Sequence, residues 1–337
     1  MKRKTLKSLI SLGLILITTL SFVACKNKNN KDLKKVRLNE VVRSVFYAPM
    51  YAAINNGYFK DEGIDIELST GQGADKTMQQ VISGSADIGF CGPEQVIYIH
   101  NQKKDNLPII FAQLTQKDGS FLVGRNEDKD FKWSDLKGKT IIGGRPGGMP
   151  EMTLEYVLKN NGIENQKNVD IITNIAFTAT AGAFKAGTGD YVALFEPTAS
   201  MLEKDKSSHI VESIGKSAGN IPYTGFFATE SYIKENGELI EAFTRAIYKG
   251  QTWILETSNE EIAKAIESFF PGTDRDIIVN VLKNYKDIDA FSKTPVIKEE
   301  EMNKLMDIIE SYDSNLIPSR PSFDKLVTNK FSEKVVK

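Results

Sequence analysis

The sequence has 337 residues, of which 41% are hydrophobic and 26% are charged, the balance of an ordinary globular protein. Its 43 basic and 44 acidic side chains nearly cancel, and no basic patch stands out, which argues against a nucleic-acid partner. The two histidines, His100 and His209, lie far apart, and the chain lacks the parts of a zinc site, a Cys–His pair or a Ser–His–Asp triad. We therefore expect no catalytic residue, no metal and no cofactor.

The first segment has the pattern of an export signal. Residues 1–7 (MKRKTLK) carry four positive charges and no acid, residues 8–23 are almost wholly apolar or small, and Cys25 follows Ala24. This junction resembles a bacterial lipobox, although Phe22 stands where leucine is more usual. The resemblance implies a signal peptide over 1–24, cleavage before Cys25, and acylation (palmitate) of its thiol. An uncleaved anchor helix is the alternative, but the apolar run is slightly short for a full span.

Residues 25–34 are polar and rich in lysine, without apolar periodicity, so we expect a disordered tether. The folded part then lies at the extracytoplasmic face of the cell membrane, held to the lipid bilayer through Cys25. Cys91 is the remaining cysteine after acylation, so we expect no intramolecular disulfide.

Two series of apolar strands, each strand followed by a helix, indicate an α/β protein. The first series comprises Lys35–Arg43, Ala48–Asn56, Ile64–Ser69, Ala74–Ser83, Ala86–Phe90, Pro93–Asn101 and Pro108–Leu114. The second comprises Thr140–Ile142, Met149–Asn160, Val169–Thr173, Thr180–Lys185, Tyr191–Phe195 and Pro197–Lys204. This alternation predicts parallel sheets covered on both faces, with ligands outside the carboxyl ends of the strands.

The chain is predicted to cross between two lobes twice. Gln113–Arg125 can form two strands that meet end to end, and Tyr223–Thr229 reads as a returning strand. We infer that residues 35–117 plus 225–337 form lobe 1 and residues 118–224 form lobe 2. The later segments with helical spacing should pack back onto lobe 1: Glu238–Glu256, Glu260–Phe269, Asp274–Asn284 and Lys298–Ser311. Two crossings make a hinge, and a hinge between lobes makes a cleft that can close.

The loop Gly143–Met149 (GGRPGGM) joins a strand to a helix in lobe 2 and fits neither the P-loop nor the dinucleotide fingerprint. We predict that it faces the ligand. Gly147 and Gly148 allow close approach of the backbone, the helix that follows offers N–H groups, and Arg145 can clamp an anion. A structural turn with a solvated arginine is the alternative.

Three loops at strand ends of lobe 1 supply further candidate ligand-binding residues: Phe46 and Tyr47, Gln72 and Gly73, and Cys91 and Glu94. The adjacent aromatic rings can stack on a flat ligand, the second loop can offer an amide and backbone N–H groups, and the third allows close backbone approach. The alternatives are a hydrophobic staple, a simple helix cap, and a small buried residue at a strand end.

Lobe 2 and the return crossing add four candidates: Phe177, Phe195, Glu196 and Tyr223. Glu196 ends a strand and can accept hydrogen bonds from ligand N–H or O–H groups. Because Pro197 suits the first turn of a helix, Glu196 can equally be the N-cap of that helix. Tyr223 can line the cleft or belong to the hinge.

Three stretches carry a resemblance to a known group: residues 41–73 (VVRSVFYAPMYAAINNGYFKDEGIDIELSTGQG), residues 81–97 (VISGSADIGFCGPEQVI) and residues 135–149 (DLKGKTIIGGRPGGM). In this order after a lipobox, they are similar to the periplasmic-binding-protein-like (type II) superfamily. That superfamily includes the aliphatic-sulfonate, taurine and thiamine-pyrimidine binding proteins of ABC importers. The resemblance implies a two-lobed fold with two hinge crossings, a ligand cleft, and delivery of the ligand to a membrane permease.

We therefore expect a monomeric, lipid-anchored solute-binding protein of an ABC importer. The aromatic candidates and the Glu196 acceptor favour a thiamine-pyrimidine-like or other aromatic heterocycle, with an aliphatic sulfonate or taurine next, because an unpaired carboxylate beside an anion is costly. A pyrimidine-synthase-like enzyme of the same superfamily is an alternative, but its cysteine-rich loop has no counterpart in Gly143–Met149. A sensory or adhesive lipoprotein that reuses the fold is the other.

Overall fold

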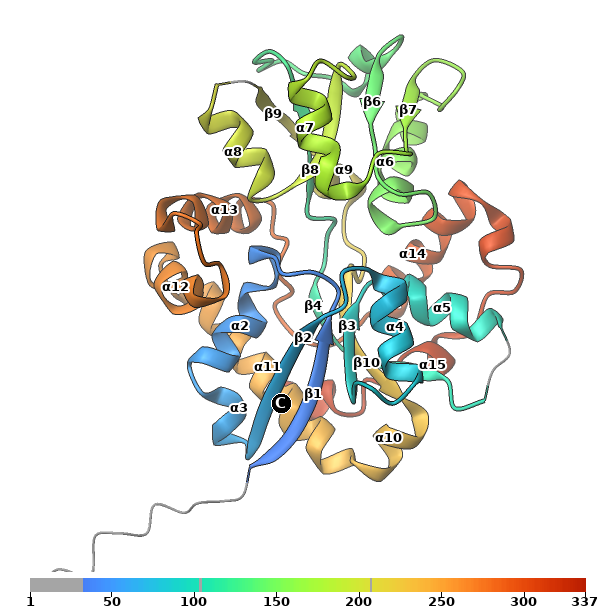
Figure 1. Cartoon of the computed structure of the whole chain (residues 1–337). Coiled ribbons are helices and arrows are strands. Elements are labelled where there is room, and N and C mark those ends of the chain that lie inside the picture. The colour runs from blue at the N-terminus through green and yellow to red at the C-terminus, as the bar shows by residue number, and fades with distance from the viewer. Residues whose placement is uncertain (1–32, 103–104, 207) are drawn as a thin grey trace, which may run out of the picture. The chain divides into compact units, whose positions relative to one another are not determined.

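Two five-stranded sheets, one in each of two lobes, organise the chain (Figure 1). The computed structural model describes residues 33–102, 105–206 and 208–337, and residues 35–337 form one unit. The first sheet has the order β2-β1-β3-β10-β4, and its strands are β1 Lys34–Glu40, β2 Ile64–Thr70, β3 Ile88–Cys91, β4 Pro108–Thr115 and β10 Thr224–Thr229. The second has the order β7-β6-β8-β5-β9, and its strands are β5 Ser120–Gly124, β6 Thr140–Ile142, β7 Asp170–Ile172, β8 Tyr191–Phe195 and β9 His209–Ser213.

Each sheet contains one strand that runs against its neighbours, so the prediction of parallel sheets is wrong for these strands. β1 pairs with β3 in parallel, and β6 pairs in parallel with β7 and β8. In contrast, β10 is antiparallel to β3 and β4, and β5 is antiparallel to β8 and β9. The reason is topological: β5 and β10 enter their sheets from the opposite lobe and not through a crossover helix.

Helices cover the sheets, and most of them agree with the predicted segments within a few residues. Those between the strands are α2 Ala48–Asn55, α3 Tyr58–Asp61, α4 Ala74–Ile82, α5 Glu94–Asn101, α6 Met149–Asn160, α7 Thr180–Lys185, α8 Thr198–Lys204 and α9 Ile214–Ala218. The later ones are α10 Glu230–Glu235, α11 Gly237–Glu256, α12 Asn259–Ile266, α13 Arg275–Asp287, α14 Glu299–Tyr312, α15 Phe323–Leu326 and α16 Ser332–Val336. Short 3-10 turns are η1 Val45–Tyr47, η2 Trp133–Leu136, η3 Phe177–Ala179, η4 Glu267–Phe269 and η5 Ser314–Leu316. The sequence did not predict β9 or the short helices α3, α9, α10, α15 and α16.

The two crossings run side by side between the lobes. Residues 116–119 join β4 to β5, and residues 219–223 lead from α9 to β10. The N–H of Ile221 donates to the carbonyl of Gln116 (3.0 Å), and the N–H of Tyr223 donates to the carbonyl of Thr115 (3.1 Å). The two crossings are therefore hydrogen-bonded to each other, while the exact lobe boundaries at 117/118 and 224/225 stay a prediction.

The late helices contact both lobes. α11 and α12 pack on α2 of the first lobe, as predicted, but α13 also contacts α8 and α14 also contacts α6, both in the second lobe. The Nζ of Lys304 in α14 donates to the carbonyl of Ala218 in α9 (2.5 Å). Figure 1 shows α13 and α14 on opposite flanks of the crossings. The sequence pattern had assigned these helices to lobe 1 alone, whereas in the structure α13 and α14 contact both lobes.

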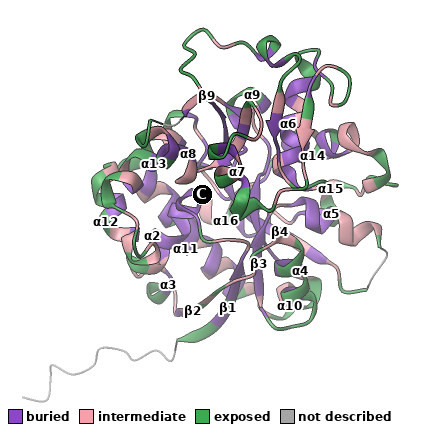
Figure 2. Ribbon diagram, turned by 45° about the horizontal axis from the view of Figure 1, so that its top comes forward, coloured by how far each residue is buried: buried purple, intermediate pink, exposed green. Residues whose placement is uncertain are grey.

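The main hydrophobic core is continuous between the two sheets. One cluster of buried side chains includes Phe90 and Phe226 of the first sheet together with Phe121 and Val192 of the second. A smaller cluster around Trp133 belongs to the second lobe. Figure 2 shows buried residues along both sheets and exposed ones on the outer helices and loops. The space between the lobes is thus largely filled by side chains.

The predicted signal peptide (residues 1–24), the acylated Cys25 and residues 26–32 of the tether lie outside the described residues. Lys34, the last residue of the predicted tether, already belongs to β1. Across residues 33–102, 105–206 and 208–337, no helix combines the length and the apolar character needed to cross a membrane.

Candidate functional site

Aromatic rings from both lobes meet beside the two crossings. Phe46 lies in η1 after β1, where the hydroxyl of Ser44 accepts the N–H of Phe46 (3.2 Å) and caps the turn. The Phe46 ring is fully buried, and its centroid lies 4.7 Å from that of Tyr285, 5.9 Å from that of Tyr223 and 6.2 Å from that of Phe195. Because Phe46 belongs to the first lobe and Phe195 ends β8 of the second, this aromatic cluster connects the lobes.

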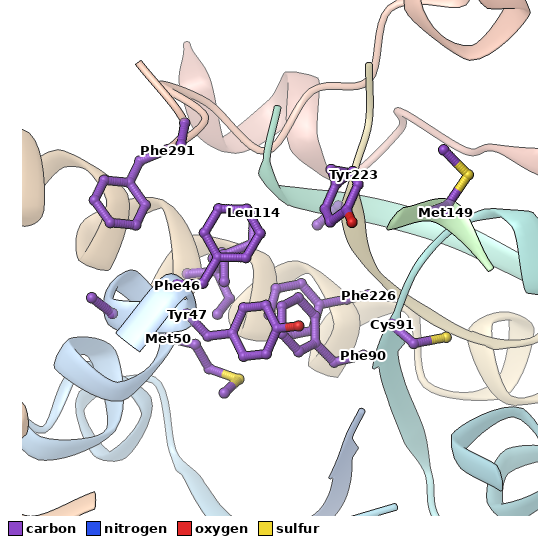
Figure 3. Packing of buried hydrophobic residues seen from close by; sticks show 14 of the residues in the cluster. Phe46, Tyr47, Met50, Phe90, Cys91, Leu114, Met149, Tyr223, Phe226 and Phe291 are labelled. Atoms are coloured by element: carbon purple, nitrogen blue, oxygen red, sulfur yellow. The ribbon is translucent and has the colours of Figure 1, made fainter. Parts of the chain in front are cut away.

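Tyr47 extends the cluster into the first lobe. Its ring meets the ring of Phe90 edge-on at 4.7 Å, and Phe90 stacks on Phe226 at 4.5 Å. Figure 3 shows Tyr47 beside this pair, with Tyr223 on the facing segment. Burial, and after it the charge of Glu40, raises the pKa of Tyr47 far above its ordinary value, so the hydroxyl stays protonated.

Gly119 in the first crossing makes the approach of the two aromatic rings possible. A Cβ atom at Gly119 would lie 2.9 Å from the Phe46 ring and 3.1 Å from the Phe195 ring. Any side chain there would force these rings apart, which the sequence alone did not indicate.

Glu94 brings a buried carboxylate to the first-lobe side of this cluster. It is the first residue of α5, is only 4% exposed, and folds back over Gly92, where a Cβ would collide with its Oε2. That Oε2 has no hydrogen-bond partner among the described residues. Burial raises the pKa of Glu94 to about 7, while hydrogen bonding from its own backbone and from the Gln95 side chain, and after them the charge of Arg145, lower it. Cys91, buried at the end of β3, has a thiol whose pKa burial raises well above its ordinary value.

Asp118 brings a second buried carboxylate, from the first crossing. One oxygen, Oδ1, accepts the N–H of Ser120 (2.6 Å) and also the Ser120 hydroxyl. The other oxygen, Oδ2, is buried and has no partner of hydrogen-bonding geometry in the described part of the chain, and the same holds for the hydroxyls of Tyr223 and Thr153. Burial raises the pKa of Asp118 to about 6, while Ser120, Tyr223 and Thr153 lower it. The Oδ2 of Asp118 and the hydroxyls of Tyr223 and Thr153 therefore lie near one another, but no hydrogen bond of regular geometry joins them.

The first two glycines of GGRPGGM make room for Glu151. The N–H of Gly144 donates to the Oε2 of Glu151 (2.6 Å), and a Cβ at Gly143 would collide with the same oxygen. Burial raises the pKa of Glu151 to about 8. These glycines therefore serve the packing of the loop on α6.

The last two glycines shape the part of the loop that faces the first lobe. Gly147 has a φ of 70°, a conformation that favours glycine, and its carbonyl accepts the hydroxyl of Tyr98 in α5 (3.2 Å). Gly148 precedes α6, and its N–H donates to the carbonyl of Arg145 (3.0 Å). The loop thus contacts α5 directly, and its N–H groups are partly used within the loop.

Arg145 and the predicted loop of Gln72 and Gly73 lie at the exposed edge between the lobes. The Arg145 side chain is 60% exposed, and its Nη1 lies 3.4 Å from the Oδ1 of Asp75 in the first turn of α4. Gln72 is exposed, with a φ of 57°, and the N–H of Gly73 donates to the carbonyl of Val41 (3.0 Å). This cation is therefore solvated and paired rather than aimed at the buried cluster.

Glu196 has partners for both of its carboxylate oxygens. Oε2 accepts the N–H of Ser200 (2.9 Å), and Oε1 accepts the Ser200 hydroxyl (2.7 Å) and the side-chain amide of Asn284 in α13 (2.6 Å). The residue is 2% exposed. Glu196 is not the N-cap of α8, which is Pro197, but its side chain accepts an N–H of the first turn of that helix, so these partners leave little room for the predicted ligand contact.

Phe177 lies outside the buried cluster. Its side chain is 60% exposed, and its ring centroid lies 6.0 Å from that of Phe195. The two rings border a hollow of about 280 Å³, with Thr180, Leu194 and Thr198 among its other walls. Phe195 therefore stands between this hollow and the buried rings.

The structure brings together four of the predicted residues, Phe46, Tyr47, Phe195 and Tyr223, with Cys91 and Glu94 beside them. Direct contact of any of the predicted residues with a ligand stays a prediction. Sequence reasoning missed Asp118, Gly119, Thr153 and Tyr285. The Asp-Gly-Ser stretch inside the predicted crossing was an available signal, because a charged residue and a glycine there interrupt two apolar strands. Among the described residues, no group of His, Cys, Asp or Glu is arranged to hold a metal ion.

Comparisons with known proteins bear on the family and the fold of the chain. Residues 45–261 match the family described as NMT1/THI5 like. The "Putative binding protein YtlA" of Bacillus subtilis is 43% identical over 94% of both chains, and the formylaminopyrimidine-binding protein of Halalkalibacterium halodurans is 22% identical over 88% of this chain and 85% of its own. Among solved structures, the alkanesulfonate-binding protein SsuA of Xanthomonas axonopodis, bound to MOPS, superposes with a TM-score of 0.68 at 15% identity, covering 88% of this chain and 99% of its own. The fold is that of periplasmic binding proteins, as predicted, and the chain belongs to the NMT1/THI5-like family.

Proposed function

We propose that the chain is the solute-binding protein of an ABC importer that captures a small, flat organic ligand between its lobes. The observation that carries this proposal is the meeting of Phe46 with Phe195 and Tyr223, because it places rings of both lobes and the crossings around one buried region. A ligand that stacks on rings of both lobes, in place of contacts between those rings, stabilises the closed arrangement of the lobes. The family, and a relative of 43% identity named as a binding protein, support this class of function.

An aromatic nitrogen heterocycle is the ligand class that the residues favour. Aromatic side chains stack on flat rings, and the buried Glu94 and Asp118 offer acceptors but no positive charge. Arg145, the cation predicted for a sulfonate, is exposed and paired with Asp75. A relative that binds formylaminopyrimidine supports the same ligand class, at 22% identity.

The proposal includes the partners expected from the sequence. A closed, ligand-loaded protein presents both lobes to a membrane permease, and anchoring through an acylated Cys25 keeps it beside that permease as a monomer on the extracytoplasmic face. Mass spectrometry of the membrane-extracted protein tests the anchor, since an acylated cysteine at the new N-terminus would carry the added mass.

Thermal unfolding with a ligand panel tests the proposed function. The panel holds 4-amino-5-hydroxymethyl-2-methylpyrimidine, thiamine, taurine and two alkanesulfonates, each added to the purified protein. A ligand at a hundred times its Kd adds about 2.7 kcal/mol of stability, which raises the unfolding midpoint by roughly 5–10 °C for a protein of this size. We expect a shift with the pyrimidine.

Two phenylalanine variants make the assignment of the site specific. Phe195→Ala should abolish the shift, whereas Phe131→Ala, which removes a partly buried ring near Trp133 in the second lobe, should preserve it. Equal shifts in both variants would place the ligand elsewhere. A shift in the unfolding midpoint with a sulfonate alone would show that the proposed heterocyclic ligand is wrong. A new product after incubation with a pyrimidine would support the enzyme alternative instead.

A further inference from the structure

Two buried carboxylates, Glu94 and Asp118, each have one oxygen with unused hydrogen-bonding capacity. Glu94 comes from the first lobe and is 4% exposed, and Asp118 comes from the first crossing and is fully buried. The Oε2 of Glu94 and the Oδ2 of Asp118 have no hydrogen-bond partner within the described ranges. Buried polar atoms are rarely left without a partner in native proteins, so each such atom calls for an explanation.

The two carboxylates act on the same hydroxyl group. Burial raises the pKa of Tyr223 well above its ordinary value; Asp118 is the next cause, through its charge and hydrogen bonding, and Tyr47 and the charge of Glu94 follow. Glu94 acts on Tyr47 in the same way. Electrostatic effects on a pKa decrease with distance. The side chains that share one buried region between the lobes are therefore Glu94, Asp118, Tyr47 and Tyr223.

The two carboxylates supply the negative charge of this region, and the neighbouring hydroxyls of Tyr223 and Thr153 carry no charge. A carboxylate presents lone pairs only, and an unpaired one in a buried place costs free energy until a donor reaches it. A bound anion would add a like charge, whereas an N–H group of a ligand, and above all a cationic one, would form charge-assisted hydrogen bonds. Arg145, the nearby cation, is already paired with Asp75 at the exposed edge.

We propose that Glu94 and Asp118 form an acceptor pair that determines specificity, selecting a flat base with N–H donors and rejecting sulfonates and other anions of the same shape. This inference rests on the proposed function, since it assumes that the ligand lies between the lobes. It assigns to Asp118 a role in ligand selection that no sequence motif indicates.

A series of ring compounds of matched shape tests the pair. Benzamidine is cationic with N–H donors, benzamide is neutral with one N–H₂ group, and benzoate and benzenesulfonate are anions. Isothermal titration of the purified protein with each compound should rank their affinities in that order. In Glu94→Gln and in Asp118→Asn, the affinity for benzamidine should fall by roughly tenfold or more, because each substitution removes one charged acceptor.

Matched variants separate this effect from damage to the fold. Glu196→Gln removes a buried carboxylate whose oxygens already have partners, so benzamidine affinity should change little. The ligand-free Glu94→Gln protein should unfold at the same or a higher temperature than the wild type, since a buried unpaired charge is gone. A marked fall in that temperature would make Glu94 a structural residue and overturn the pair.

The outcomes also distinguish this inference from the proposed function. If benzoate or benzenesulfonate binds at least as tightly as benzamidine and Phe195→Ala still weakens that binding, the site between the lobes stands and the acceptor pair is wrong. If no compound of the series binds to the wild type, both the acceptor pair and the aromatic site between the lobes are wrong.

Discussion

Glu94 and Glu196 occupy comparable places in the two lobes and have opposite surroundings. Each lies next to the proline at the N-cap of a helix that follows a strand, Glu94 just after Pro93 as the first residue of α5 and Glu196 just before Pro197, and each is less than 5% exposed. The oxygens of Glu196 accept three hydrogen bonds from Ser200 and Asn284. In contrast, the Oε2 of Glu94 accepts none from the described residues.

The difference teaches that burial alone does not identify a ligand-binding acid. A carboxylate whose partners come from its own protein stabilises the fold, and Glu196 ties α8 to α13 in this way. A carboxylate left without partners destabilises the empty protein and is tolerated where function needs it. Glu94 and Asp118 each keep one buried oxygen, Oε2 and Oδ2, without a partner among the described residues, and the following three predictions test this contrast in order of decreasing effect.

The largest effect should appear in the pH dependence of stability. The pKa of Glu94 is raised from 4.5 to about 7 in the folded protein, so the folded state binds more protons than the unfolded state between these values. The free energy of unfolding should therefore fall as the pH rises from about 4.5 to 7, by on the order of 3 kcal/mol. Urea unfolding at several pH values measures this slope; Glu94→Gln should reduce it, and the remainder should come from other buried acids with a raised pKa, Glu151 above all.

Asp118 adds to the same trend at lower pH, because its pKa is raised from 3.8 to about 6. Glu256→Gln on the exposed end of α11 serves as a control and should leave the slope unchanged. A wild-type protein that gains stability over this pH range would contradict the assignment of both acids as unpaired.

The second effect concerns Glu196→Ala. This variant leaves the N–H of Ser200 and the amide of Asn284 without an acceptor in a buried place, which should cost about 2 kcal/mol of unfolding free energy. Glu196→Gln retains one carbonyl oxygen and should cost less. Chemical denaturation measures both. A Glu196→Ala protein of normal stability that no longer binds ligand would restore the ligand contact predicted from the sequence and remove the contrast with Glu94.

The smallest effect belongs to the exposed ion pair at the edge of the lobes. Arg145 and Asp75 are 60% and 49% exposed, so Arg145→Ala should cost less than about 1 kcal/mol, and the cost should shrink as salt is added. A double-mutant cycle with Asp75→Ala isolates the coupling of the two charges. A larger loss of ligand affinity than of stability would show that Arg145 contacts the ligand after all.

The sequence predicted most of the fold because apolar runs, glycines and prolines mark the strand–loop–helix units locally. It missed β9, because the residues His209–Ser213 show no apolar alternation and most of them are only partly buried. It also missed the antiparallel direction of β5 and β10, because strand direction depends on the lobe from which the chain arrives and not on local pattern.

The candidate site was predictable only in part. Phe46, Tyr47, Phe195 and Tyr223 were found because aromatic residues at strand ends converge on one edge of each sheet. The partners of Glu196 could not be found, since Asn284 lies far along the chain in α13. The sequence did not predict Asp118 as a site residue, because it lies in a crossing, where neither helical nor strand periodicity applies.

The position of β10 also affects the order in which the lobes can form during synthesis. All strands of the second sheet come from the continuous stretch between β5 and β9, so that sheet can assemble as soon as Ser213 has left the ribosome. The first sheet must wait, because β10 is the strand that joins β3 to β4. A chain that stops before Thr224 would therefore expose the unpaired edges of β3 and β4, and exposed strand edges favour aggregation.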